Sequence, residues 1–258
     1  MSKTLNIALI QTTLHWEDPV NNRKMFDEKL ATIPSNVDVI VLPEMFTSGF
    51  TMNPGNIEPS EGEITVDWMK ALAKEKDSAM VGSIVFQEEN QFYNRLFFVY
   101  PDGSFKHYDK KHTFTLAGED QVYEAGNEKL ILDFKGFKIC PMICYDLRFP
   151  VWSRNSEDYD VLMYVANWPK KRIAAWDTLL KARAIENMAY CVGVNRVGLD
   201  GADFECTGHS AVYDVLGEQL CYSEKEEVLY ATLDKAHIED TRKQLRFLED
   251  RDRFSLIE

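Results

Sequence analysis

The sequence has few cysteines and no run of apolar residues long enough to cross a membrane. Five cysteines occur among 258 residues, and an odd number without dense spacing excludes a disulfide framework. No stretch approaches the ~20 apolar residues of a membrane-spanning helix. The first apolar run is too short for a secretory signal peptide, and no small-residue cleavage site follows it. We therefore expect a cytoplasmic protein with reduced thiols.

The sequence also has fewer basic than acidic residues. The chain has 29 Lys and Arg against 42 Asp and Glu, which gives a formal net charge of -13 at pH 7. This balance argues against nucleic acid or an anionic membrane surface as the main partner. It does not exclude a small anionic substrate, because a local cation can hold an anion inside an acidic protein.

The chain lacks low-complexity tracts, internal repeats and linkers rich in Pro, Gly or Ser, so we expect one domain over residues 1–258. Most of its apolar runs are continuous, as in strands that are covered on both faces. The predicted strands are 5–11, 37–43, 79–86, 94–100, 138–144, 160–166, 190–196, 210–216 and 227–233. Helical spacing is found at 19–31, 64–76, 172–188 and after residue 236. Strands that alternate with helices predict an α/β architecture.

Polar or aromatic residues stand directly after three of the predicted strands. VIVLP is followed by Glu44, KICPMI by Cys144, and VLMYVA by Asn167 and Trp168. In layered α/β proteins, ligands bind beyond the carboxyl ends of the strands. A polar residue at one strand end is equally typical of an ordinary surface, so the predicted site depends on all three ends together.

Cys144 is the most informative of the five cysteines. Inert packing is one interpretation. A disulfide with Cys140 is excluded, because four residues of strand span ~13 Å and a disulfide requires Cα atoms within ~7 Å. No CxxC pair or histidine cluster completes a metal site. Cys191 lies in an apolar strand and is expected in the core, and we assign no role to Cys206 or Cys221.

A nucleophile is the remaining interpretation of Cys144. A thiol nucleophile needs a base, and it needs a cation or dipole that holds the developing oxyanion. The chain offers Glu44 or a histidine as the base. The turn sequence PDG at 101–103 predicts a hairpin whose returning arm carries Lys110, the candidate cation. A helix that begins near FPVWSRN would add backbone N–H groups.

Three motifs, PEMFTSGF, YDKKH and ICYDLRFP, occur in this order along the chain. They resemble the Glu, Lys and Cys motifs of the nitrilase superfamily of carbon–nitrogen hydrolases. NWP after the next strand and ARAIEN in the following helix extend the resemblance, which runs from NIALIQ to SAVYDVLGE. Within the family, MFTSGF, CYDLRFPVWSRN and YVANWP are similar to the bacterial omega-amidases, which hydrolyse 2-oxoglutaramate and related omega-amides.

The resemblance implies a catalytic triad of Cys144 as nucleophile, Glu44 as base and Lys110. The expected reaction cleaves the terminal amide of 2-oxoglutaramate through a cysteine thioester and yields 2-oxoglutarate and ammonia. Lys110 and the backbone N–H of Tyr145 would hold the oxyanion. The chemistry requires no metal and no organic cofactor.

The family also implies a second glutamate shortly before the next strand. Its offset ahead of the AGN turn points to Glu119, which would orient Lys110 and compensate its charge. Asp120 and Glu124 stand close by in the sequence and are the alternatives.

Several further residues are expected near the substrate. The candidates for contact with it are Phe46, Tyr145, Asn167, Trp168, Lys171 and Arg172. Lys171 and Arg172 are included because a keto-acid amide carries a carboxylate. Asp146 and Arg148 have two interpretations: they contact substrate, or, as we favour, they pair with nearby carboxylates and fix the strand end.

The family fold is a four-layer αββα sandwich whose members usually pair into an eight-layer homodimer. The resemblance therefore implies this fold and this dimer, with the C-terminal residues 236–258 as a possible interface tail. Neither the four layers nor the dimer follows from the apolar pattern alone.

Three rival interpretations remain. Other members of the family act on deaminated glutathione, aliphatic amides, N-carbamoyl compounds or nitriles. A Cys–His hydrolase would use His112 or His209 as the base, although no motif places an orienting Asn or Asp. A thiol-bearing binding protein on the same scaffold is the alternative that is not an enzyme.

Overall fold

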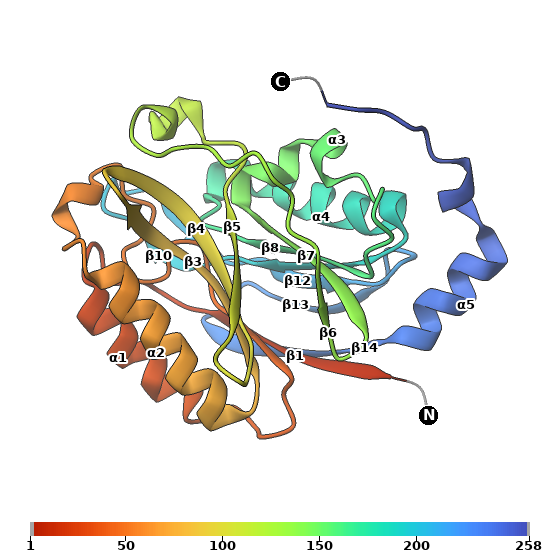
Figure 1. Ribbon diagram of the computed structural model, residues 1–258, viewed down its shortest axis with the longest axis horizontal. Helices are drawn as coiled ribbons and strands as arrows, with labels where there is room; N and C mark the ends of the chain where they lie inside the picture. The colour runs from red at the N-terminus through yellow and green to blue at the C-terminus, as the bar shows by residue number, and fades with distance from the viewer. Residues whose placement is uncertain (1–2, 257–258) are drawn as a thin grey trace.

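Two β-sheets that pack face to face form the centre of the computed structural model, which describes residues 3–256 (Figure 1). The first sheet has the strand order β14-β1-β2-β3-β4-β5. Its β1, β2 and β3 are parallel, and the outer strands pair antiparallel. The bounds are β1 Thr4–Gln11, β2 Val39–Val41, β3 Ala79–Glu88, β4 Gln91–Val99, β5 Phe105–Asp109 and β14 Glu227–Asp234.

The second sheet repeats this plan with the order β13-β12-β9-β8-β7-β6. Its β7, β8 and β9 are parallel, and the outer strands again pair antiparallel. A separate hairpin consists of β10 and β11. The bounds are β6 Leu132–Phe134, β7 Phe137–Ile143, β8 Val161–Val165, β9 Tyr190–Val194, β10 Val197–Leu199, β11 Glu205–Thr207, β12 Ser210–Tyr213 and β13 Gln219–Ser223.

Helices cover the outer face of each sheet (Figure 1). The helices α1 (Pro19–Leu30) and α2 (Glu61–Lys76) lie on the first sheet, and α4 (Ile173–Asn187), with the short α3 (Pro150–Ser153) beside it, lies on the second. The molecule is thus a four-layer αββα sandwich. The helix α5 (Lys235–Leu245) lies at one edge, outside these layers.

The continuous apolar runs follow from burial on both faces of the sheets. In β1, Leu5, Ile7 and Leu9 face the core between the two sheets, whereas Ala8 and Ile10 face α1 and α2. All five side chains are buried. A strand with two buried faces has no polar face, so the alternating pattern of a half-exposed strand is absent.

The ends of the helices follow from local chemistry. The Asp18 side chain accepts a hydrogen bond from the Asn21 N–H at 3.0 Å and so caps α1, whose first residue is a proline. The helices α2 and α4 end where Asp77 and Met188 adopt the left-handed conformation, with φ of 52° and 45°.

All of the predicted strands and long helices are present, and the predicted α/β sandwich is confirmed. The pattern missed β6, β10, β11 and β13, because each has only three to five residues, which is too short for a recognisable apolar run. The PDG turn connects β4 and β5 as predicted. Within residues 3–256, no helix combines the length and the hydropathy needed to span a bilayer.

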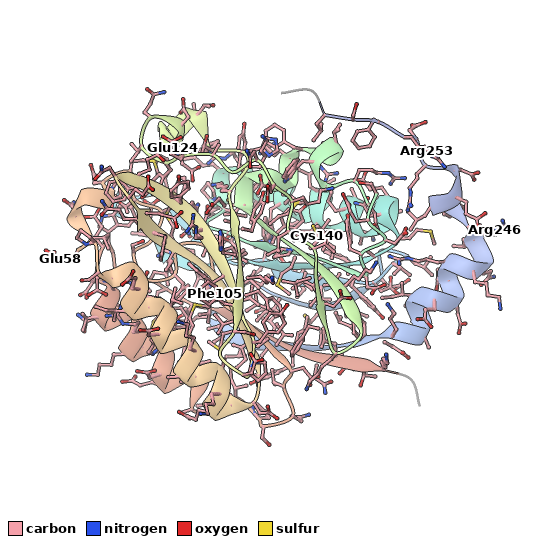
Figure 2. All side chains as sticks on the ribbon, viewed as in Figure 1. Glu58, Phe105, Glu124, Cys140, Arg246 and Arg253 are labelled. Carbon is pink, nitrogen blue, oxygen red and sulfur yellow. The ribbon has the colours of Figure 1, made fainter. Side chains whose placement is uncertain are left out.

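The segment after α5 runs along the periphery of the molecule, where Figure 2 labels Arg246 and Arg253. Phe247 and Phe254 in this segment are exposed. Arg242 ties α5 to the second sheet by donating to the carbonyl oxygens of Tyr159 at 2.6 Å and Met188 at 2.9 Å. An interface role for residues 236–258 stays a prediction, as does the dimer, and residues 257 and 258 lie outside the described part of the chain.

Candidate active site

The ends of strands from both sheets bring the predicted triad together. Glu44 follows β2, Lys110 directly follows β5, and Cys144 directly follows β7. Met45, next to Glu44, and Cys144 itself both have positive φ, of 43° and 42°. Such backbone is uncommon outside glycine and accumulates at functional sites, because the surrounding structure must hold it in place.

Lys110 lies between two buried carboxylates. Its Nζ is 2.9 Å from Oε1 of Glu44 and 2.8 Å from Oε2 of Glu119. The side chain of Asn94 on β4 donates to Oε1 of Glu44 at 2.8 Å and to Oε1 of Glu119 at 3.2 Å. The Phe114 N–H donates to Glu119 at 2.6 Å. The four polar side chains thus form one connected network.

The structure distinguishes among the three candidate second acids. Glu119 is fully buried and contacts Lys110, whereas Asp120 and Glu124 are exposed. Figure 2 labels Glu124 in the segment that protrudes above β4 and β5, where its N–H donates to the Phe92 carbonyl oxygen at 2.8 Å. Only Glu119 therefore lies where it can orient Lys110.

The charges in this network act on one another strongly. Burial alone would lower the pKa of Lys110, but the carboxylates of Glu119 and Glu44 reverse this and hold the pKa above its usual value. Burial raises the pKa of Glu119, although Lys110 partly opposes the rise. Lys110 is therefore a permanent cation at the bottom of the site.

The Cys144 thiol is protonated in this environment. Burial and the Glu44 carboxylate raise its pKa well above the usual value, against the opposing effect of Lys110. A protonated thiol near a carboxylate is the arrangement that a base-assisted attack needs, because the carboxylate can accept the proton.

The same pKa shifts predict a loss of stability in alkaline solution. Burial raises the pKa of Cys140, Cys144 and Cys191 above the ~8.5 of a free cysteine. Above pH 8.5 the unfolded chain therefore releases protons that the folded chain keeps. The free energy of unfolding should fall by about 1.4 kcal/mol per pH unit for each such cysteine.

Urea unfolding in a reducing buffer at pH 8, 9 and 10 measures this slope. The double variant Cys140→Ala, Cys191→Ala should lose stability less steeply than the wild type over the same range. An identical slope in the two proteins would show that these thiols do not cause the pH dependence.

Asn167 holds the base in place from the end of β8. Its backbone N–H donates to Oε2 of Glu44 at 2.8 Å, and its side-chain Nδ2 donates to the Glu44 carbonyl oxygen at 2.6 Å. With Asn94 and Lys110 on Oε1, both carboxylate oxygens of Glu44 are engaged by donors. The carboxylate is fixed toward the thiol.

A cavity of about 300 Å³ opens over Cys144. Lys110 reaches it, and Asn167 forms part of its wall. The rest of the lining is mainly apolar, and its aromatic residues are Trp16, Phe50, Phe114, Tyr145, Trp168 and Phe204. This volume lies at the lower end of the range for ligand sites and suits a small substrate.

The predicted substrate residues divide into two groups. Tyr145, Asn167, Trp168 and Arg172 line the cavity. Phe46 and Lys171 do not, and their predicted contact with substrate is wrong for this structure. Their actual positions follow from their neighbours.

Phe46 is fully buried in the core between the first sheet and its helices. Its ring centroid is 5.4 Å from that of Phe26 and 5.9 Å from that of Trp68. Lys171 is exposed, and its Nζ lies 5.5 Å from the ring centroid of Phe204.

Asp146 and Arg148 have different surroundings. Asp146 is buried and accepts hydrogen bonds from the Tyr108 hydroxyl at 2.8 Å and from the backbone N–H of Ile143 at 3.1 Å, so it fixes the turn after β7. The favoured pairing of Arg148 with a carboxylate is wrong. Arg148 lines the cavity above the ring of Trp168 at 4.9 Å.

Two guanidinium groups in the cavity wall have no acidic partner among residues 3–256. Neither Arg148 nor Arg172 forms an ion pair or a side-chain hydrogen bond there, and Arg172 lies 5.0 Å from the ring centroid of Phe114. Unpaired arginines in a small cavity can bind a carboxylate, because the guanidinium group matches it in charge and geometry.

Neither candidate histidine base lines the cavity. Nδ1 of His112 is 2.8 Å from Oδ1 of Asp146, and the ring stacks on Phe149 at 3.6 Å between centroids. Nδ1 of His209 is 3.0 Å from Oδ1 of Asp177 on α4. The structure thus gives no support to a Cys–His pair. Among the described residues, no group of three His, Cys, Asp or Glu could hold a metal ion.

Sequence reasoning missed Asn94 and Trp16, and for Arg148 it favoured a carboxylate pair over contact with the substrate. The amide of Asn94 at the start of an otherwise apolar run was an available indication. The sequence around Trp16 gave no such indication, because the role of this residue depends on segments far away along the chain.

The chain belongs to the carbon–nitrogen hydrolase family. The Carbon-nitrogen hydrolase family model matches residues 6–243, and the resemblance stated above is thereby confirmed. Nit3 of Saccharomyces cerevisiae, a member of branch 10 of the nitrilase superfamily, has the same fold, with a TM-score of 0.85, 25% identity and 94% of each chain covered.

Three proteins are similar to this chain over nearly its whole length. It is 43% identical to the omega-amidase YafV of Yersinia enterocolitica, over 98% of this chain and 99% of that one. It is 31% identical to the 2-oxoglutaramate amidase of Bacillus subtilis, over 95% and 96%. A carbon–nitrogen hydrolase superfamily protein of Xanthomonas campestris, solved with an arsenic adduct in its active site, is 40% identical with a TM-score of 0.95, over 98% and 99%.

Proposed function

We propose that the protein hydrolyses the terminal amide of 2-oxoglutaramate and releases 2-oxoglutarate and ammonia. The observation that carries this proposal is one small cavity that holds the Cys144 thiol together with the unpaired guanidinium groups of Arg148 and Arg172. Such a cavity suits a short amide with a carboxylate at its other end. The similarity to an omega-amidase and a 2-oxoglutaramate amidase supports the same substrate.

The first half of the reaction forms a thioester. Glu44 takes the proton of the Cys144 thiol, and the sulfur attacks the carbonyl carbon of the amide. The oxyanion that develops is stabilised by the Lys110 ammonium and the backbone N–H of Tyr145. Tyr145 lies in the first turn of the 3-10 helix Cys144–Arg148, where N–H groups have no partner within the helix.

The second half releases both products. Protonated Glu44 gives its proton to the amide nitrogen, the C–N bond breaks, and ammonia leaves. Glu44 then takes a proton from a water molecule that attacks the thioester, and the C–S bond breaks to release the acid. The thiolate recovers a proton from Glu44, so the enzyme returns to its starting state.

Glu119 acts on this chemistry through Lys110. Its two oxygens lie 3.0 and 2.8 Å from Nζ, so they hold the ammonium in one position. Glu119 is therefore a positioning residue, and it also compensates the buried charge of Lys110.

Ammonia release from a panel of amides tests the proposed function. The panel contains 2-oxoglutaramate, glutamine, succinamate, butyramide and a simple aliphatic nitrile. We expect the highest kcat/KM with 2-oxoglutaramate and no turnover of the nitrile. Turnover of another amide without 2-oxoglutaramate would keep the mechanism and discard this substrate. If no compound of the panel released ammonia, the binding-protein interpretation would be favoured.

The variants Arg172→Gln and Arg148→Gln should lose kcat/KM for 2-oxoglutaramate by about 10- to 100-fold, mainly through KM. A hydrogen bond to a charged group is worth about 1.5–3 kcal/mol, and each variant removes one such partner of the carboxylate. Turnover of uncharged butyramide should change little. Lys171→Gln is the matched control, since this exposed lysine stands next to Arg172 but outside the cavity. An equal loss on both amides would contradict carboxylate binding.

A further inference from the structure

The indole of Trp16 is clamped between two glycines that come from distant parts of the chain. A Cβ atom added at Gly201 would lie 2.1 Å from Cε2 of this ring. A Cβ atom added at Gly49, whose φ is 74°, would lie 2.9 Å from Cε3. No other residue fits at Gly201 without moving the ring, because real Cβ atoms do not approach so closely.

The backbone around Trp16 is held as firmly as its ring. The buried Asn22 of α1 accepts from the His15 N–H at 2.8 Å and donates to the His15 carbonyl oxygen at 2.7 Å. On the other side, the Glu17 N–H donates to the Ser48 carbonyl oxygen at 2.8 Å. Trp16 therefore has little freedom to move aside.

Trp16 lines the same cavity as Cys144. Its neighbours in the wall come from the two segments that clamp it. Phe50 follows Gly49, while Asp200, Ala202 and Phe204 belong to the turn between β10 and β11 that contains Gly201. The indole and these two segments form one continuous part of the cavity wall.

We propose that Trp16 determines substrate specificity by limiting the length of the acyl group. This inference rests on the proposed function and adds to it a preferred size of keto acid. The indole should exclude a longer chain from this cavity of about 300 Å³, because hydrogen bonds hold the backbone on both sides of Trp16 and two glycines pack closely against its ring. One methylene in an apolar pocket changes kcat/KM by about 10- to 200-fold.

The test compares omega-amides of 2-oxo dicarboxylic acids with four, five, six and seven carbons. In the wild type we expect kcat/KM to fall sharply beyond five carbons. In Trp16→Ala the ratio of the six-carbon to the five-carbon substrate should rise by at least about 10-fold. Trp16→Phe should give a smaller rise.

Trp68→Ala is the matched control. This tryptophan lies on α2, donates to Asp27 at 2.8 Å and does not line the cavity, so its replacement should leave the ratio unchanged. The readout is the ratio of two kcat/KM values measured on the same protein. General damage to the fold lowers both values alike and leaves the ratio unchanged.

An equal change for all chain lengths in both Trp16→Ala and Trp16→Phe would overturn the inference. Failure of the wild type to hydrolyse any of these amides would instead overturn the proposed function, and the inference with it. Activity of the wild type on this series therefore shows whether the proposed function or only the inference has failed.

Discussion

Replacing Cys144 with alanine should reduce ammonia release from 2-oxoglutaramate by at least about 10³-fold, and Glu44→Gln should do the same. The alanine variant has no sulfur to attack the amide. The glutamine variant cannot take the thiol proton, and burial keeps that thiol protonated near neutral pH. Because the two groups act in one step, the double variant should be little worse than either single variant.

Two controls distinguish this mechanism from its rivals. Cys221→Ala removes a half-buried thiol on β13 outside the cavity and should leave turnover unchanged. His112→Ala removes the stacking on Phe149 and the contact with Asp146, so we expect a modest loss only. Loss of activity in His112→Ala together with retention in Glu44→Gln would exclude Glu44 as the base. Mass spectrometry of the wild type during turnover should detect an acyl group on Cys144.

Replacing Lys110 with methionine should impair both catalysis and stability. Loss of one oxyanion donor costs about 10²- to 10³-fold in kcat. Removal of the ammonium also leaves Glu44 and Glu119 buried without their cation, and breaking a buried ion pair in this way costs about 3–5 kcal/mol of unfolding free energy. Steady-state kinetics and urea unfolding measure the two effects separately.

The stability loss in Lys110→Met should depend on pH. Burial already raises the pKa of Glu119, and without Lys110 the rise should be larger. A carboxyl with a raised pKa contributes stability at low pH and loses it as the pH rises through the folded pKa. The gap between the variant and the wild type should therefore widen from pH 5 to pH 8.

Lys111→Met is the control for Lys110→Met. Lys111 forms no ion pair among residues 3–256, and its Nζ lies 5.5 Å from the ring centroid of Trp152. This variant should keep nearly full activity and stability. If Lys110→Met retained more than half of the wild-type kcat, Lys110 would not be the oxyanion cation.

Much of the fold could be predicted from the sequence, because strands and helices depend on patterns of residues that are close together along the chain. A strand covered on both faces must be apolar throughout, so β1, β3, β7, β8 and β9 appear as continuous runs. The short strands β6, β10, β11 and β13 have no such pattern. Each forms by pairing with another strand: β6 with β7, β13 with β12, and β10 with β11.

The order of the motifs along the chain already singles out Glu44, Lys110 and Cys144, because each stands at or near a strand end. The groups that join these three residues depend on how the chain folds. The tertiary structure placed Glu119 rather than Asp120 or Glu124 on Lys110, turned Arg148 and Arg172 into the cavity, and buried Phe46 in the core.

The physical reason for this division is the range of the interactions. Strand formation and motif spacing depend on residues close together along the chain. By contrast, Asn94 meets Glu44 across 50 positions and Asn167 meets it across 123. Trp16 packs against Gly49 and Gly201, which lie far from it along the chain. Contacts of this kind leave no pattern in a single sequence, so the shape of the cavity is a property of the folded protein alone.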